Sequence, residues 1–262
     1  MATIARILRS RPEPLPGALR PSGWRLLTAL VAAAVAAAAV GSAVAALARA
    51  VAPQWSADLD RLAPLVIASV YAAVIAALLA VLGRSRSDRR RYLALNRPTR
   101  GDVALGAAAW AAAYVVAAAY YVVSEPLGGS GIGDAGQLLL SVGADNGRLD
   151  AAGPILATLV LVRILLLSPV AEELLFRGAL FTWLRSRLPA RWTILVTGVL
   201  FGLMHQAPAF LPLAILVGFA AGWIRERTGT VAVPIMIHSV QSAAVVLVSL
   251  IMTGWDTPAL LG

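Results

Sequence analysis

The chain has 262 residues, of which 60% are hydrophobic and 13% are charged, and its mean hydropathy is +0.81. These values exclude an ordinary soluble domain and favour a polytopic membrane protein. Cysteine is absent, which excludes disulfides and thiolate chemistry. The net charge of +9 comes from arginines that cluster between apolar runs, as in cytoplasmic membrane loops, so we expect the lipid bilayer and not nucleic acid as a partner.

Three membrane spans are predicted in the N-terminal region, after a basic, proline-containing arm at residues 1–25. Each apolar run has roughly the 20 residues that a helix needs to cross the hydrocarbon core. The runs are Leu26–Ala48, Leu62–Leu82 and Val103–Val123. Small residues at a signal-peptidase-like spacing follow the first run, but this run is too long for the apolar part of a signal peptide. We therefore interpret it as an uncleaved span.

Two loops within region 26–150 predict the orientation in the membrane. The basic loop 83–102 carries seven arginines and two aspartates, and such a loop is expected in the cytoplasm. The glycine-rich loop 124–150 carries mostly acidic charge and is expected outside. The lack of lysine and the alanine-rich runs are typical of a GC-rich bacterial genome. We therefore expect an integral protein of a bacterial cytoplasmic membrane, with its N-terminus in the cytoplasm.

The region 151–253 predicts four further spans, and a short tail follows at 254–262. An apolar stretch at 151–188 is interrupted only by Pro169, which favours either one kinked helix or two stacked half-helices. Three more runs follow it: Trp192–Gln206, Phe210–Ile224 and Val231–Met252. The predicted fold class is therefore all-α, a polytopic transmembrane helical bundle of about seven spans.

Ionisable residues lie inside three of these spans, where each costs several kcal/mol unless it is paired or functional. Measured by helix rise from the nearest cytoplasmic arginine, Glu172 lies roughly 20 Å deep, His205 roughly 21 Å and His238 roughly 16 Å. Structural polar groups scattered along the spans would not be expected at one level. A buried polar network that orders the bundle is the alternative interpretation.

Helix geometry separates the two adjacent glutamates of "SPVAEELLFRG". Glu173 and Arg177 are four residues apart on one face and are expected to form an ion pair. Glu172 points about 100° away from Glu173 and is the better candidate for a general base, with His205 sharing its water. Phe201, one turn before His205, either restricts the histidine ring or simply packs.

Three motifs resemble those of the CPBP family, the CAAX-processing and bacteriocin-processing (Abi-type) intramembrane proteases. "EELLFR" matches EExxxR, "FGLMH" matches FxxxH, and "GTVAVPIMIHSV" matches the third motif. The resemblance covers about residues 150 to 250 and implies that 151–253 is a catalytic helical core whose cavity opens towards the cytoplasm.

The resemblance also implies roles for individual residues. Glu172 would activate water with His205, Glu173 and Arg177 would support the site, and His238 would help to hold the oxyanion. One position departs from the family pattern. Asn is common four residues after the second histidine, but Ser242 stands there, with Gln241 one place earlier. Either side chain is a candidate for the oxyanion contact.

The function predicted from these residues is an intramembrane endopeptidase that cleaves a membrane-associated peptide or protein through a glutamate-activated water. No HExxH is present, so the sequence leaves open whether Glu172, His205 and His238 bind a divalent metal such as zinc. Two alternatives remain: a non-catalytic immunity or scaffold protein that keeps the fold, and a proton-coupled transporter, although no paired halves with interrupted helices are visible.

Overall fold

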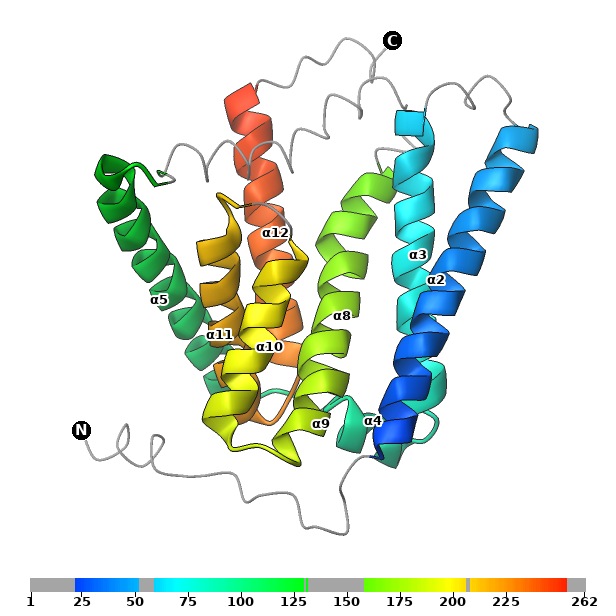
Figure 1. Ribbon diagram of the computed structural model, residues 1–262, viewed down its shortest axis with the longest axis horizontal. Helices are drawn as coiled ribbons and strands as arrows, with labels where there is room; N and C mark the ends of the chain where they lie inside the picture. Colours follow the sequence, from blue (N-terminus) through cyan, green and yellow to red (C-terminus); the bar gives the residue numbers. More distant parts are fainter. Residues whose placement is uncertain (1–21, 52–58, 130, 132–157, 206–207, 254–262) are drawn as a thin grey trace.

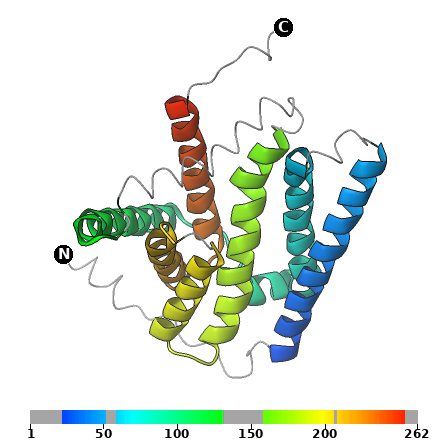
Figure 2. The ribbon, with the colours of Figure 1, turned by 45° about the horizontal axis from the view of Figure 1, so that its top comes forward.

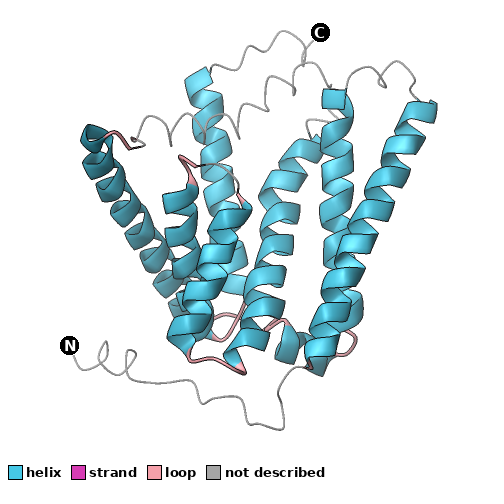
Figure 3. Cartoon of the chain, viewed as in Figure 1, coloured by secondary structure: helices cyan, strands magenta, loops and turns pink. Residues whose placement is uncertain are grey.

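The computed structural model of the chain describes residues 22–51, 59–129, 131, 158–205 and 208–253. This part is helical with short connections, and no strand occurs among the described residues (Figure 3). The helices before the long central one are α2 (Gly23–Val51), α3 (Leu59–Leu82), α4 (Arg86–Tyr92), α5 (Arg100–Ser124) and the 3-10 turn η3 (Glu125–Leu127). Those after it are α10 (Ala190–Met204), α11 (Leu211–Thr228) and α12 (Ala232–Thr253). Within the described residues each predicted span overlaps a helix, although the span predicted to end at Gln206 is helical only to Met204. The all-α prediction is confirmed.

In the part of the chain that the structure describes, three helical segments are long and apolar enough to cross a membrane. They are Gly23–Val51, Leu65–Leu82 and Arg100–Leu127, and shorter apolar segments occur at Ala190–Met204 and Ala232–Val248. The fold is therefore a helical membrane bundle. Most of the predicted N-terminal arm, most of the loop 124–150 and the tail 254–262 lie outside the described residues.

The central helix is continuous from residue 158 to residue 185, and it is the yellow-green ribbon in the middle of Figure 2. It contains two π-helical stretches, η4 (Arg163–Leu167) and η5 (Leu174–Leu180), on either side of α8 (Ser168–Glu173), and it ends in α9 (Phe181–Arg185). Pro169 lies in the first turn of α8, directly after η4. Proline lacks an N–H and clashes with the carbonyl four residues earlier, and the wider π turn accommodates both defects. The structure therefore resolves the alternative in favour of one helix, with α8 held between two π-helical turns.

The arginine-rich connections gather at one end of the bundle (Figure 1). At this end lie the start of α2, helix α4, the α9–α10 connection and the α11–α12 connection. Arg25 ties α2 to α4, with bonds to Tyr92 at 3.1 Å and to Asp88 at 3.4 Å. Desolvation alone would raise the pKa of Asp88, but the hydrogen bonds from Arg25 and Ser85 outweigh it and lower that pKa.

Helices α10 and α11 approach each other closely through glycines. A Cβ on Gly218 would lie 2.7 Å from the carbonyl oxygen of Gly198, so the two backbones are in direct contact. Gly202, one turn after Gly198, faces Ile215 in the same way. Small residues four apart allow such approach in membrane helices, where association depends on packing rather than on the hydrophobic effect. The α10–α11 pair is thereby closely packed, and both helices contact the central helix.

Candidate active site

A carboxylate, a guanidinium and an imidazole meet in the interior of the bundle. Oε1 of Glu173 accepts hydrogen bonds from Nη1 of Arg177 at 3.1 Å and from Nδ1 of His238 at 3.2 Å. Glu173 and Arg177 have no exposed surface, and His238 is 8% exposed. The predicted ion pair between Glu173 and Arg177 is therefore present in the structure. The bond from His238 connects this pair to α12.

Arg177 makes further contacts with residues of α10 and α11. Its Nη2 donates to the carbonyl of Gly218 at 3.0 Å, and its guanidinium lies 4.3 Å from the ring centre of Phe201. The backbone carbonyl of Arg177, within η5, accepts from Nε of Arg225 at 3.1 Å. Together these contacts connect the central helix to α10 and α11.

Glu172 lies in a different environment from Glu173. Its Oε1 accepts from Oγ of Ser168 at 2.5 Å and from Oη of Tyr71 at 3.3 Å. Its Oε2 is buried and has no hydrogen-bond partner among the described residues. The structure thus places two hydroxyl donors on one oxygen of Glu172 and leaves the other oxygen unpaired. Neither Ser168 nor Tyr71 was predicted as a site residue.

His205 is the C-cap residue of α10, and the hydrogen bond of its ring indicates which nitrogen carries the hydrogen. Its Nδ1 lies 2.9 Å from the carbonyl oxygen of Phe201. A carbonyl can only accept, so Nδ1 carries the hydrogen and Nε2 of the neutral ring is an acceptor. No hydrogen bond joins Glu172 to His205 or His238 within the described part of the chain, so the predicted cooperation of Glu172 and His205 would have to pass through a water.

Phe201 is buried at 2% exposure at the centre of this group. Its ring centre lies 4.8 Å from that of His205 and 6.0 Å from that of His238, and Arg177 stacks on it. Phe201 therefore both packs and confines the ring of His205. As a substrate-contacting residue it remains a prediction.

The two candidates for the oxyanion contact differ in their partners. Oε1 of Gln241 accepts from Nε1 of Trp110 on α5 at 2.5 Å. The side chain of Ser242 makes no hydrogen bond to any of the described residues. Both are partly exposed, on the helix that carries His238.

The ligand types for a metal are present, but their arrangement does not fit one. No three His, Asp or Glu side chains of the described residues are grouped closely enough to hold an ion. Nδ1 of His238 is bonded to Glu173 and Nδ1 of His205 to a carbonyl, so each histidine keeps Nε2 as its one potential ligand atom. We therefore derive no chemistry through a metal.

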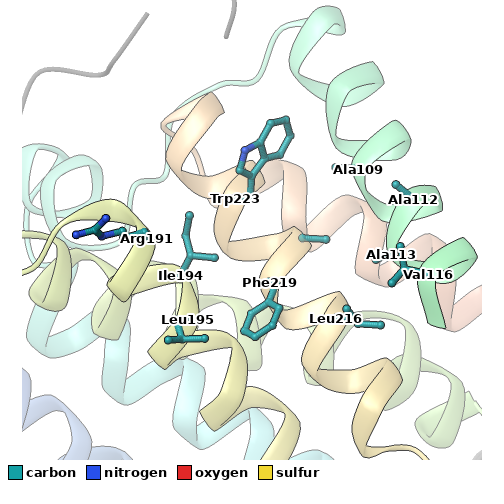
Figure 4. A pocket seen from close by; sticks show the side chains of 11 residues that line it. Ala109, Ala112, Ala113, Val116, Arg191, Ile194, Leu195, Leu216, Phe219 and Trp223 are labelled. Carbon is teal, nitrogen blue, oxygen red and sulfur yellow. The ribbon is translucent and has the colours of Figure 1, made fainter. Parts of the chain in front are cut away.

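A separate apolar groove lies on another face of the molecule, between α5, α10 and α11 (Figure 4). Its volume is about 590 Å³, and its walls include Ala112, Ile194 and Phe219, with Arg191 as the single charged residue of its lining. None of the predicted site residues lines it. The groove is therefore distinct from the polar site inside the bundle.

Comparison with known proteins supports a membrane protease as the class of this protein. Residues 154–244 match the family model described as "Type II CAAX prenyl endopeptidase Rce1-like". This interval contains all the residues predicted from the three motifs, and the resemblance to the CPBP family is thereby confirmed over this part of the chain.

One curated protein that the chain resembles is the "Putative membrane peptidase YdiL" of Bacillus subtilis (strain 168). The two are 29% identical over 85 residues, which is 32% of this chain and 35% of the other protein. The matched segment therefore spans about a third of that relative's length. No solved structure matches the chain.

Proposed function

We propose that this protein is an intramembrane endopeptidase that hydrolyses a peptide bond in a membrane-associated protein or peptide. The contrast between the two adjacent glutamates carries the proposal. Glu173 is fully buried, neutralised by Arg177 and bound to His238, whereas Glu172 is 8% exposed and, among the described residues, forms no ion pair and accepts hydrogen bonds from hydroxyl groups alone. Each of the two carboxylates keeps one buried oxygen without a hydrogen-bond partner among these residues. Two carboxyl groups held in unlike environments commonly divide chemical and structural roles between them.

In the proposed reaction, the unpaired Oε2 of Glu172 takes a proton from a water molecule. The water oxygen attacks the peptide carbonyl, whose electron pair moves onto the carbonyl oxygen. When the tetrahedral intermediate collapses, the C–N bond breaks and the proton held by Glu172 passes to the leaving amine. Nε2 of neutral His205 can accept a hydrogen bond from the same water and so orient it.

Glu173, Arg177 and His238 hold the site in shape in this proposal. Because Nδ1–H of His238 is directed at Glu173, the buried carboxylate fixes the tautomer and the orientation of that ring. Arg177 balances the charge of Glu173 and joins the central helix to α11 through Gly218. Removing any of the three would leave a buried charge or donor without its partner.

The proposal is tested with purified protein in detergent and a set of internally quenched hydrophobic peptides, including a farnesylated CAAX peptide. Wild-type protein should cleave at least one of them. Glu172→Gln should lower the rate by at least the factor of about 10²–10⁴ that general-base catalysis contributes, without a change in melting temperature. Glu125→Gln, an exposed glutamate outside the site, is the matched control and should stay fully active.

Full activity of Glu172→Gln would overturn the proposed mechanism. Failure of well-folded wild-type protein to cleave any of the peptides would instead favour a non-catalytic immunity or scaffold protein. A proton-coupled transporter would be indicated if liposomes containing the protein moved protons and Glu172→Gln abolished that flux.

A further inference from the structure

Trp110 on α5 reaches the face of α12 that carries His238 and Gln241. It is 5% exposed, its ring centre lies 6.1 Å from that of His238, and its Nε1–H donates to Oε1 of Gln241 at 2.5 Å. The approach of the two helices depends on Gly106, one turn earlier on α5. A Cβ there would lie 2.5 Å from side-chain atoms of Val233 and Ile237 on α12. The backbone of α5 is therefore close enough for a single indole to contact two polar residues of α12.

The indole determines which way the carboxamide of Gln241 points. An indole nitrogen can only donate a hydrogen bond, so the atom that faces it must be the amide oxygen. The NH₂ group of Gln241 is consequently directed away from Trp110, and it has no hydrogen-bond partner among the described residues. A flexible side chain is thus held with a free donor, which is the group that a developing oxyanion needs.

His238 is poorly suited to be that donor by itself. Its Nδ1–H is committed to Glu173, and in the neutral form of the ring Nε2 can then only accept. Ser242, at the position where the resembling family commonly has Asn, has a shorter side chain and a single hydroxyl donor. Among these residues of α12, Gln241 is the one that offers a fixed amide N–H.

We propose that Trp110 is a positioning residue, which holds the carboxamide of Gln241 with its N–H donors available to the oxyanion formed during peptide cleavage. This inference rests on the proposed function. It assigns a role to α5, which lies outside the segment matched by the family model. The alternative role for the same bond is structural, as a link that only ties α5 to α12.

A double-mutant cycle on the proteolytic rate tests whether Trp110 acts through Gln241. Trp110→Phe keeps an aromatic ring and removes the N–H, and it should lower kcat roughly tenfold with KM unchanged, because the amide is then free to flip. Gln241→Leu should lower kcat by at least as much, since losing an oxyanion donor costs about 10²–10³ in related chemistry. The double variant should be no slower than Gln241→Leu alone. Additive losses, or full activity in Trp110→Phe, would overturn the inference.

Tyr121→Phe is the matched control for Trp110→Phe. Tyr121 is a buried aromatic residue of the same helix that also loses one hydrogen bond, to the carbonyl of Ala209, and this bond involves neither α12 nor Gln241. A merely structural role predicts equal effects of the two substitutions on stability and on kcat. The positioning role predicts a loss of kcat in Trp110→Phe only.

Two further variants keep the inference testable if Trp110→Phe folds poorly. Gln241→Glu retains an acceptor for the indole but has no amide donor, so it should fold and lose activity. Ser242→Asn should restore part of the kcat in the Gln241→Leu background, because it returns an amide to this face of α12. Full activity of Gln241→Glu would overturn the inference. An active Glu172→Gln variant would contradict the proposed function instead, so the two failures are distinguishable.

Discussion

Nδ1 of His238 lies 3.2 Å from Oε1 of Glu173, although the two residues are 65 positions apart and belong to different helices. The same oxygen accepts a hydrogen bond from Arg177, so one buried carboxylate joins Arg177 and His238 into a single network. The network has almost no exposed surface. It is therefore a part of the bundle's packing as well as of its candidate chemistry.

Arg177→Met should destabilise the protein by about 3–5 kcal/mol, because it leaves the charge of Glu173 buried beside a histidine alone. Thermal unfolding in one detergent, followed by circular dichroism, measures this. The matched variant is Arg177→Met combined with Glu173→Leu, which removes both charges and should recover much of the loss. A melting temperature for Arg177→Met equal to that of wild type would contradict the pairing.

Ser168→Ala should reduce the cleavage rate by roughly one order of magnitude, because hydrogen bonds to a charged group contribute about 1.5–3 kcal/mol. Tyr71→Phe should reduce it less, since its bond to Glu172 is 3.3 Å long against 2.5 Å for Ser168. Both variants should remain folded at the temperature of the assay, so that the loss of rate is not a loss of folded protein. Ser69→Ala is the control, because its hydroxyl bonds only to a backbone carbonyl of the same helix. If Ser168→Ala kept full activity, the hydroxyl donors would have no part in orienting Glu172.

Contacts within one helix could be predicted from the sequence. The pair Glu173–Arg177 is spaced at i, i+4, and its opposite charges indicate the contact. The pair Ser168–Glu172 has the same spacing, but it was not predicted because serine carries no charge. The apolar runs likewise predicted the helices, since a span needs only length and hydrophobicity.

Contacts between helices could not be predicted from one sequence. Tyr71 and Trp110 lie about 100 and 130 positions from Glu172 and Gln241, and nothing in their local sequence indicates a partner. The π-helical turns also escaped prediction, because Pro169 permits a kink, two half-helices or a widened turn, and packing decides among these. His205 was expected inside a span, yet α10 ends at Met204 and His205 follows as its cap.

Gly218→Ala should lower the free energy of unfolding by about 1–3 kcal/mol, because the added methyl would overlap backbone atoms of Gly198 that cannot move without separating α10 from α11. Gly222→Ala on the same helix is the matched control. Its Cβ would meet Ile194 at 3.4 Å, an ordinary contact, and both substitutions gain the same helix propensity. Equal melting temperatures for the two variants would mean that the α10–α11 contact is looser than the structure has it.

Gly218→Ala should also affect catalysis, because the carbonyl of Gly218 accepts from Arg177. A shift of this carbonyl would disturb Arg177 and, through it, Glu173. We therefore expect a lower cleavage rate in Gly218→Ala at a temperature where the protein remains folded, and an unchanged rate in Gly222→Ala.

The last prediction concerns orientation in the membrane. The start of α2, helix α4, the α9–α10 connection and the end of α11, which carry most of the arginines of the described residues, lie together at one end of the bundle (Figure 1), while Arg49 lies at the other end of α2. Positive charge is retained on the cytoplasmic side. We propose that this end is cytoplasmic and that η3 lies outside. The chain has no native cysteine, so single cysteines introduced at Ser87 and at Leu127 report on the two ends without background. Both positions are exposed in the structure. In intact bacterial cells a membrane-impermeant maleimide should label Leu127→Cys and leave Ser87→Cys unlabelled until the cells are opened. Labelling of Ser87→Cys alone in intact cells would invert the topology, and the candidate site would then have to be reached from the other side of the membrane.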